Sequence, residues 1–212
     1  MRRGWIDRPC VVVLFSLLCM ASLAQAASAV DYWPHAVGTT WVYVDEFGNR
    51  QTTRVVESDR THAEPMIVIE SRESFWGART LRSYYVIRDG QVLQVAVGHP
   101  RFFAQGAPEM LPSPTVVYPA TLDVGTHWRS HPEDASSPET FVAGRGRIQL
   151  HDGSYEALVI GDRAGTRATT RWIVPGVGVV RMAVMEVGQP KPVRLMELER
   201  FGAPSAVPPS GG

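Results

Sequence analysis

The sequence predicts an all-β protein of about ten antiparallel strands, built from two tandem β-meander repeats that form a barrel, half-barrel or sandwich. Three observations support this prediction. Segments rich in β-branched and aromatic residues alternate with turn dipeptides. Beyond residue 26, no window carries a sustained apolar stripe at the helical period. Several blocks of sequence also recur at one fixed spacing.

The recurring blocks indicate an internal duplication. Residues 37–41 (VGTTW) recur at 124–128 (VGTHW), an offset of 124 − 37 = 87. The same offset aligns residues 92–97 (VLQVAV) with 179–184 (VVRMAV). Several blocks in one register are typical of a repeated structural unit. We therefore expect one domain over residues 27–202, with repeat 1 at about 31–97 and repeat 2 at about 120–187, followed by a final strand at 193–200.

Each unit has the pattern of a β-meander. The first unit has strand-like segments at residues 41–44, 52–57, 66–70, 80–87 and 91–97. Asp89-Gly90 joins the last two, and this dipeptide suits the positive-φ positions of a type I′ hairpin. In the second unit, Asp152-Gly153 and Pro175-Gly176 precede strand-like segments at 155–160 and 177–187.

The N-terminus has the pattern of a secretory signal. Residues 11–24 form an apolar run of 14 residues after three arginines, and this run is shorter than the ~20 residues that span a bilayer. Ala24-Gln25-Ala26 is a small-x-small cleavage site. We therefore expect a signal peptide at 1–26, a mature chain without a transmembrane segment, and a periplasmic or secreted location. Cleavage would also remove both cysteines, Cys10 and Cys19.

Two proline-rich segments lie outside the predicted repeats. Residues 98–119 contain five prolines, which exclude a central strand and predict a long linker between the repeats. Loops of this length are uncommon unless they are functional or disordered. Residues 203–212 (APSAVPPSGG) have the composition of a flexible tail.

Several of these motifs resemble a broad group of uncharacterised exported bacterial β-rich proteins. Members open with an aromatic-Pro pair and a Gly-x-x-Trp-x-Tyr segment, which correspond here to residues 33–34 and 38–43. A Trp-x-x-Pro-Gly-Val-Gly-x-Val segment corresponds to residues 172–180. The resemblance spans most of the expected mature chain. It implies a β-rich envelope protein and transfers no catalytic residue.

Charge and motifs disfavour several classes of function. The 21 basic and 21 acidic residues balance, so nothing favours nucleic acid as a partner. The basic segment at 144–147 (GRGR) fits a solvated strand edge. His127 and His131 lie four residues apart, but in a strand that spacing is about 13 Å, too far for one metal ion. The sequence has no motif that calls for a cofactor, a metal or a catalytic nucleophile.

Apolar residues in the expected loops are the candidate binding residues. They are Trp76, at an expected hairpin tip, and four residues of the linker: Phe102, Phe103, Met110 and Leu111. Apolar loop residues either pack against their own domain or meet a partner or ligand. We predict an exported cell-envelope binding protein for an apolar ligand, a lipid or a protein partner. Two alternatives remain open: a periplasmic hydrolase with a spatially assembled Asp, Glu or His site, and an inhibitor or immunity protein.

Overall fold

The structure is a computed structural model that describes residues 27–59, 64–73, 80–98 and 107–202. The expected signal peptide and tail, together with Trp76, Phe102 and Phe103, lie outside the described residues. The described chain is almost entirely β-sheet, as predicted. Its elements are η1 (Ala29–Tyr32), β1 (Thr40–Asp45), β2 (Arg50–Asp59), β3 (Met66–Glu73), β4 (Thr80–Arg88), β5 (Gln91–Gly98), β6 (Glu109–Tyr118), β7 (His127–Arg129), β8 (Glu139–Leu150), β9 (Gly153–Ala164), β10 (Arg167–Val174), β11 (Gly178–Glu186) and β12 (Arg194–Gly202).

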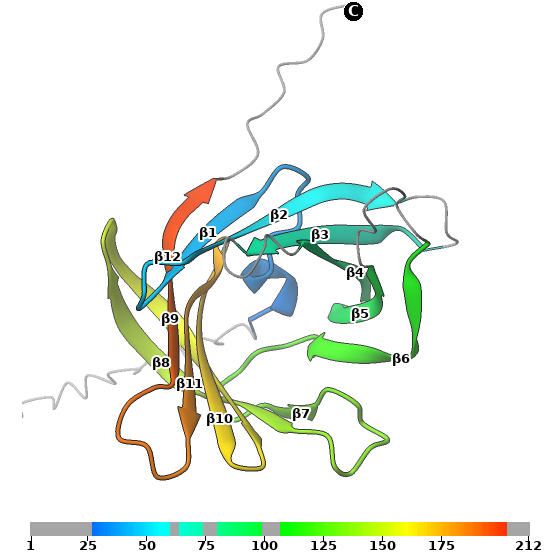
Figure 1. Cartoon of the computed structure of the whole chain (residues 1–212). Coiled ribbons are helices and arrows are strands. Elements are labelled where there is room, and N and C mark those ends of the chain that lie inside the picture. The colour runs from blue at the N-terminus through cyan, green and yellow to red at the C-terminus, as the bar shows by residue number, and fades with distance from the viewer. Residues whose placement is uncertain (1–26, 60–63, 74–79, 99–106, 203–212) are drawn as a thin grey trace, which may run out of the picture.

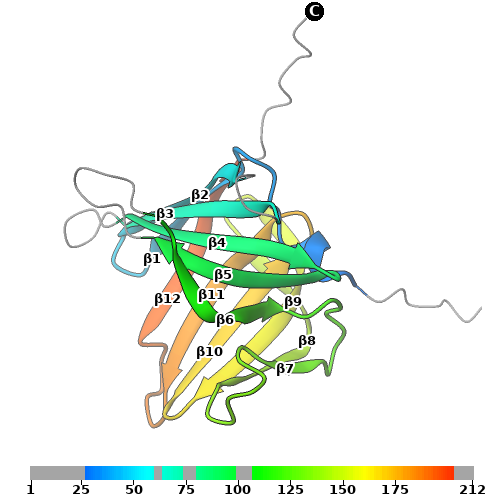
Figure 2. The same cartoon turned by 90° about the vertical axis from the view of Figure 1, so that its right-hand side faces the viewer.

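All twelve strands form one sheet in the order β6-β5-β4-β3-β2-β1-β12-β11-β10-β9-β8-β7. The sheet is therefore two six-stranded meanders, β1–β6 and β7–β12, joined where β1 pairs with β12. The two meanders cross at a steep angle and curl into a barrel-like shape (Figures 1 and 2). The two ends of the sheet approach each other where the Val116 N–H of β6 donates to the carbonyl of Ser130, the residue after β7, at 2.8 Å. The barrel is thus nearly closed.

The two meanders begin in the same way. The Gly38 N–H donates to the Val55 carbonyl, and the Gly125 N–H donates to the Val142 carbonyl, each at 2.9 Å. Gly38 and Gly125 also share the left-handed conformation, with φ of 94° and 91°, which favours glycine. Both pairs differ by the offset of 87 residues found in the sequence.

The strand number and the linker need correction. The expected linker at 98–119 contains β6 (Glu109–Tyr118), so its second half is a strand and the sheet has twelve strands rather than about ten. Pro112 and Pro114 lack the N–H group that a central strand uses to pair with its neighbours. They are tolerated in β6 because β6 is an end strand and pairs with a neighbouring strand on one side only. The prolines correctly excluded a central strand and wrongly suggested a loop.

The two tryptophans that the 87-residue offset relates differ in burial. Trp41 is buried, with 5% of its surface exposed, and packs in a cluster with Val55 and Ile69. Trp128 is only partly buried and packs against a different cluster, which contains Val142 and η1. The 87-residue offset therefore does not place the two indoles in equivalent buried positions. Trp128 lies on the end strand β7, which has a partner strand on one side only.

Most of the core lies between the two meanders. One cluster surrounds η1 and combines residues of both meanders: Ala29, Tyr32, Val92, Tyr118, Leu122, Val142, Leu158, Ile160 and Ile173. A 3-10 helix in this position fills space between sheet faces that would otherwise leave a void. The sequence offered no signal for this helix.

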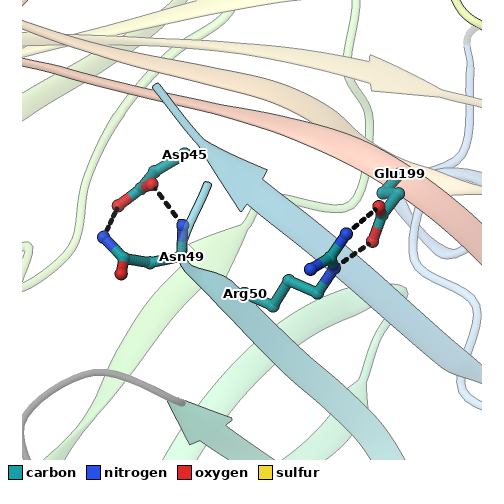
Figure 3. A network of polar contacts seen from close by, with 4 residues as sticks. All are labelled: Asp45, Asn49, Arg50 and Glu199. Atoms are coloured by element: carbon teal, nitrogen blue, oxygen red, sulfur yellow. Dashed lines mark hydrogen bonds and ion pairs between the residues drawn. The ribbon is translucent and has the colours of Figure 1, made fainter. Parts of the chain in front are cut away.

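A polar network lies where the meanders join. The Arg50 guanidinium on β2 donates to both carboxylate oxygens of Glu199 on β12, at 2.7 and 2.8 Å (Figure 3). The bond therefore bridges the intervening strand β1. In the adjacent turn, Asp45 accepts a bond from the Asn49 side chain at 2.8 Å. Both charged groups of the Arg50–Glu199 pair are exposed, so the pair contributes little to stability. Its main effect is to hold β2 and β12 in a fixed relative position.

Candidate ligand cavity

In the first meander, strands β3 to β5 are apolar on both faces. On β3, Ile69 faces the cluster with Trp41, whereas Val68 belongs to a second cluster. We call this second cluster the β3–β5 cluster; it contains Met66, Val68, Tyr84, Val86, Leu93, Val95 and Ala96. Successive strand residues point to opposite faces, so this cluster lies on the face of the sheet opposite to Ile69. Its members are at most 7% exposed, which means that something covers them.

Part of that cover comes from an irregularity in β6. Gln94 of β5 pairs with Thr115, and Ala96 pairs with Met110. The single residue Val95 therefore lies opposite the four residues 111–114, of which two are prolines. Prolines cannot donate to a β-ladder, so this stretch leaves the ladder as a large bulge. Bulges of this kind re-aim side chains at the ends of sheets.

A cavity lies beneath the bulge. Its volume is about 340 Å³, within the lower part of the range of small-molecule sites. The lining consists of six apolar residues and two charged ones: Met66, Val86, Val95, Met110, Leu111, Pro114, Glu64 and Arg88. Met110 is 54% exposed, although it is apolar. The cavity is therefore an apolar recess that opens to solvent beside Met110.

The two charged lining residues pair with one another. The Arg88 Nη2 lies 2.6 Å from the Glu64 Oε2, and Arg88 Nε donates to Oε1 at 3.3 Å. The hydrogen bond from Arg88 lowers the pKa of the Glu64 carboxyl, and the same bond raises the pKa of Arg88. Both groups are therefore ionised near neutral pH, and each neutralises the other at the rim.

A smaller cavity of about 100 Å³ lies inside the barrel beside η1. Half of its lining residues are aromatic, and two of these are hydrogen-bonded through their polar atoms. Trp41 Nε1 donates to the Val177 carbonyl, and the Tyr43 hydroxyl donates to the Val179 carbonyl at 2.9 Å. Burial raises the pKa of Tyr43 far above its usual value. This space is below the usual size of a ligand site and belongs to the packed core.

The structure brings together two of the predicted site residues. Met110 and Leu111 both line the larger cavity. The wall that faces them, formed by Met66, Val86 and Val95, was not predicted from the sequence. Part of that wall has a sequence signal: residues 66–69 (MIVI) form a continuous apolar run and residues 92–97 (VLQVAV) are apolar except for Gln94, which is the pattern of strands buried on both faces.

The histidines form no metal site in the described part of the chain. His127 Nδ1 lies 3.5 Å from Glu139 Oε1, and both side chains are more than half exposed. His131 Nε2 approaches the Thr115 hydroxyl at 3.5 Å. Among the described residues, no three His, Cys, Asp or Glu side chains gather as a metal would require.

No family model and no curated protein matches this chain. One similar crystal structure is that of a predicted exported protein with a YmcC-like fold from Bacteroides fragilis, with a TM-score of 0.49, 11% identity, and coverage of 84% of this chain and all of that one. Another is a predicted lipoprotein from Parabacteroides distasonis, with a TM-score of 0.40, 12% identity and the same coverage. At this level, neither structure bears on the activity or ligand of this chain.

The described residues contain no helix of the length and apolar character that crossing a membrane would require.

Proposed function

We propose that this chain is an exported binding protein whose ligand is apolar and occupies the cavity beneath the β6 bulge. The observation that carries the proposal is the cavity itself, with six apolar lining residues and a volume of about 340 Å³. Export is the expectation from residues 1–26, where a charged start, an apolar run and a small-x-small site follow one another.

The exposure of Met110 supports a ligand at this place. An apolar side chain left in water costs roughly 25 cal/mol for each Å², and Met110 sits at the opening rather than beneath it. Methionine is also flexible, so it adapts to ligands of irregular shape. A bound hydrocarbon chain would cover Met110 and fill the recess against Met66.

The hydrolase alternative has less support in this cavity. Glu64 and Arg88 are its titratable lining groups, and they are already paired with one another. A general acid must hold a proton near neutral pH, and a general base is weak when its pKa is far below that range. The lowered pKa of Glu64 leaves it a carboxylate in that range.

The test is calorimetric titration with a neutral amphiphile, dodecyl maltoside, below its micelle concentration. We expect saturable binding to the wild-type protein and an affinity at least about tenfold lower in Met110→Glu, because a carboxylate would be buried against hydrocarbon. Val187→Glu is the matched control, since Val187 is another exposed apolar residue, 76% exposed and outside the cavity lining. Absence of saturable binding, or equal loss in both variants, would overturn the proposal.

A further inference from the structure

The outer side of β8 is an unusually long open strand edge. The β8–β9 ladder runs the whole length of β8, to the pair Leu150–Gly153. On the other side, β7 pairs only with residues 139–141, and Val142 bonds to the loop before β7. Among the described residues, 143–150 have no backbone partner on that side. The upper part of β8 accordingly forms the left margin of Figure 1.

This edge offers backbone groups to an added strand. In an antiparallel ladder, every second residue turns its N–H and C=O groups away from the partner strand. Over residues 143–150, the N–H and C=O groups of every second residue therefore point away from β9, in the plane of the sheet. An extended peptide can pair with them by strand addition, in which the main chain supplies affinity and alternate side chains supply specificity.

One face of the edge is basic. Arg145 and Arg147 are both exposed, and residues 143–150 contain no acidic residue. Arg147 pairs with Glu156 at 3.0 Å, while no ion-pair partner of Arg145 is present among the described residues. Since the whole chain has equal numbers of basic and acidic residues, this charge is local. Side chains opposite Arg145 and Arg147 on an added strand would be favoured if acidic.

The other face carries two glycines, of which only Gly144 has a local structural reason. Gly144 lies at the bulge between Val142 and Gly144, which accounts for it. Gly146 lies in the regular ladder opposite Ala157, and a Cβ there would meet only Val159 Cγ2, at 3.8 Å. Glycine in a strand costs stability, and it often marks close approach by another group.

The same sheet shows what can cover such a glycine. Phe141 pairs with Gly161, and its ring lies so close that a Cβ on Gly161 would be 2.7 Å from Phe141 Cζ. An aromatic side chain on an added strand could cover Gly146 in the same manner. Beyond Gly146 on this face, Ile148 and Leu150 are buried in an apolar cluster that the aromatic residues would extend.

We propose that the open edge of β8, residues 143–150, binds an extended peptide segment in which acidic and aromatic residues alternate. The acidic side chains face Arg145 and Arg147, and an aromatic ring covers Gly146. A second copy of this chain fits poorly, because antiparallel pairing of two β8 edges sets Arg145 of one against Arg147 of the other, and like charges opposite each other are unfavourable.

The probe is a synthetic peptide, Thr-Glu-Phe-Glu-Tyr-Glu-Thr, with Thr-Lys-Phe-Lys-Tyr-Lys-Thr as its matched control, measured by fluorescence anisotropy with the full-length protein. We expect binding of the acidic peptide alone, and an affinity about tenfold lower in the double variant Arg145→Ser/Arg147→Ser. Arg167→Ser is the control, since Arg167 is an exposed, paired arginine of β10. Equal binding of both peptides, or of neither, would overturn the proposal.

The glycine is tested separately by Gly146→Val. Valine favours strands, and a Cβ at this position would have no contact closer than 3.8 Å, so the thermal midpoint should be unchanged or higher while peptide affinity falls. Unchanged affinity would mean that no ring covers Gly146, which contradicts the proposal. A wild-type dimer in sedimentation that Gly146→Val dissociates would also contradict it, because a second copy would then occupy the edge.

Discussion

The last hairpins of the two meanders, β5–β6 and β11–β12, differ in the regularity of their strand pairing. The β11–β12 register, Arg181–Glu197 to Val184–Arg194, continues without a shift, and Arg194–Gly202 contains no proline. The β5–β6 register shifts twice, and one shift places residues 111–114 opposite the single residue Val95. The cavity lies at that shift. The last hairpin of a meander can therefore be built without a register shift, and the cavity is a local addition made by the prolines of β6.

The largest expected effect comes from the two tryptophans that the sequence offset relates. Trp41→Ala should lower the free energy of unfolding by ~3–5 kcal/mol, because it empties a buried site and leaves the Val177 carbonyl without its donor. Trp128→Ala should cost only ~1–2 kcal/mol, because Trp128 is partly exposed on an end strand. Urea unfolding of both variants measures the difference. Equal losses would mean that the two sites are packed alike.

Glycines within one hairpin provide a second comparison. Gly161→Ala should destabilise the protein by ~1–3 kcal/mol, since the new Cβ would lie 2.7 Å from the Phe141 ring. Gly146→Ala, on the neighbouring strand, should be neutral or stabilise by ~0.5 kcal/mol, because its nearest contact would be 3.8 Å away. Thermal unfolding of the two variants checks this order. A stable Gly161→Ala protein would show that the Phe141 ring moves aside freely.

The β6 prolines provide the sharpest functional comparison. The double variant Pro112→Thr/Pro114→Thr restores two backbone N–H groups and adds side chains that favour strands. In this variant, β6 should pair with β5 without a large bulge, as β12 pairs with β11. Dodecyl maltoside affinity should then fall about tenfold, while the thermal midpoint stays the same or rises. Calorimetry and thermal unfolding of the same preparation measure both quantities. Full affinity in the variant would mean that the prolines do not make the cavity.

The smallest effect is expected at the join between the meanders. The hydrogen bond from Arg50 lowers the pKa of the Glu199 carboxyl in the folded protein. Its contribution to stability is therefore complete above the ordinary glutamate pKa, about 4.3, and disappears as the pH falls through the lower folded-state pKa. Arg50→Ala should lower the thermal midpoint slightly at pH 7, and by progressively less as the pH falls below the ordinary glutamate pKa. High salt should shrink the difference at pH 7, and a difference that persists at low pH would show that packing, rather than charge, is lost.

The sequence predicts more of the fold than of the cavity, and the reasons are physical. Alternation and turn residues act locally, so Asp89-Gly90 correctly predicted its turn, with φ of 50° and 77°. The strand β6 was not predicted, because prolines occur both in loops and in end strands and therefore do not distinguish between the two. The cavity wall at Val86 and Val95 depends on which strands lie side by side and where the register shifts, and neither is encoded in one strand alone.

The central claim is the proposal that an apolar ligand binds beneath the β6 bulge. Methionine methyl groups report on this directly, because Met66 and Met110 line the cavity while Met182, Met185 and Met196 lie in β11 and β12. In a methyl-¹³C-methionine NMR titration with dodecyl maltoside, we expect the signals of Met66 and Met110 to shift saturably while the other three stay in place. Movement of the signals from β11 and β12, with Met66 and Met110 unchanged, would contradict the account.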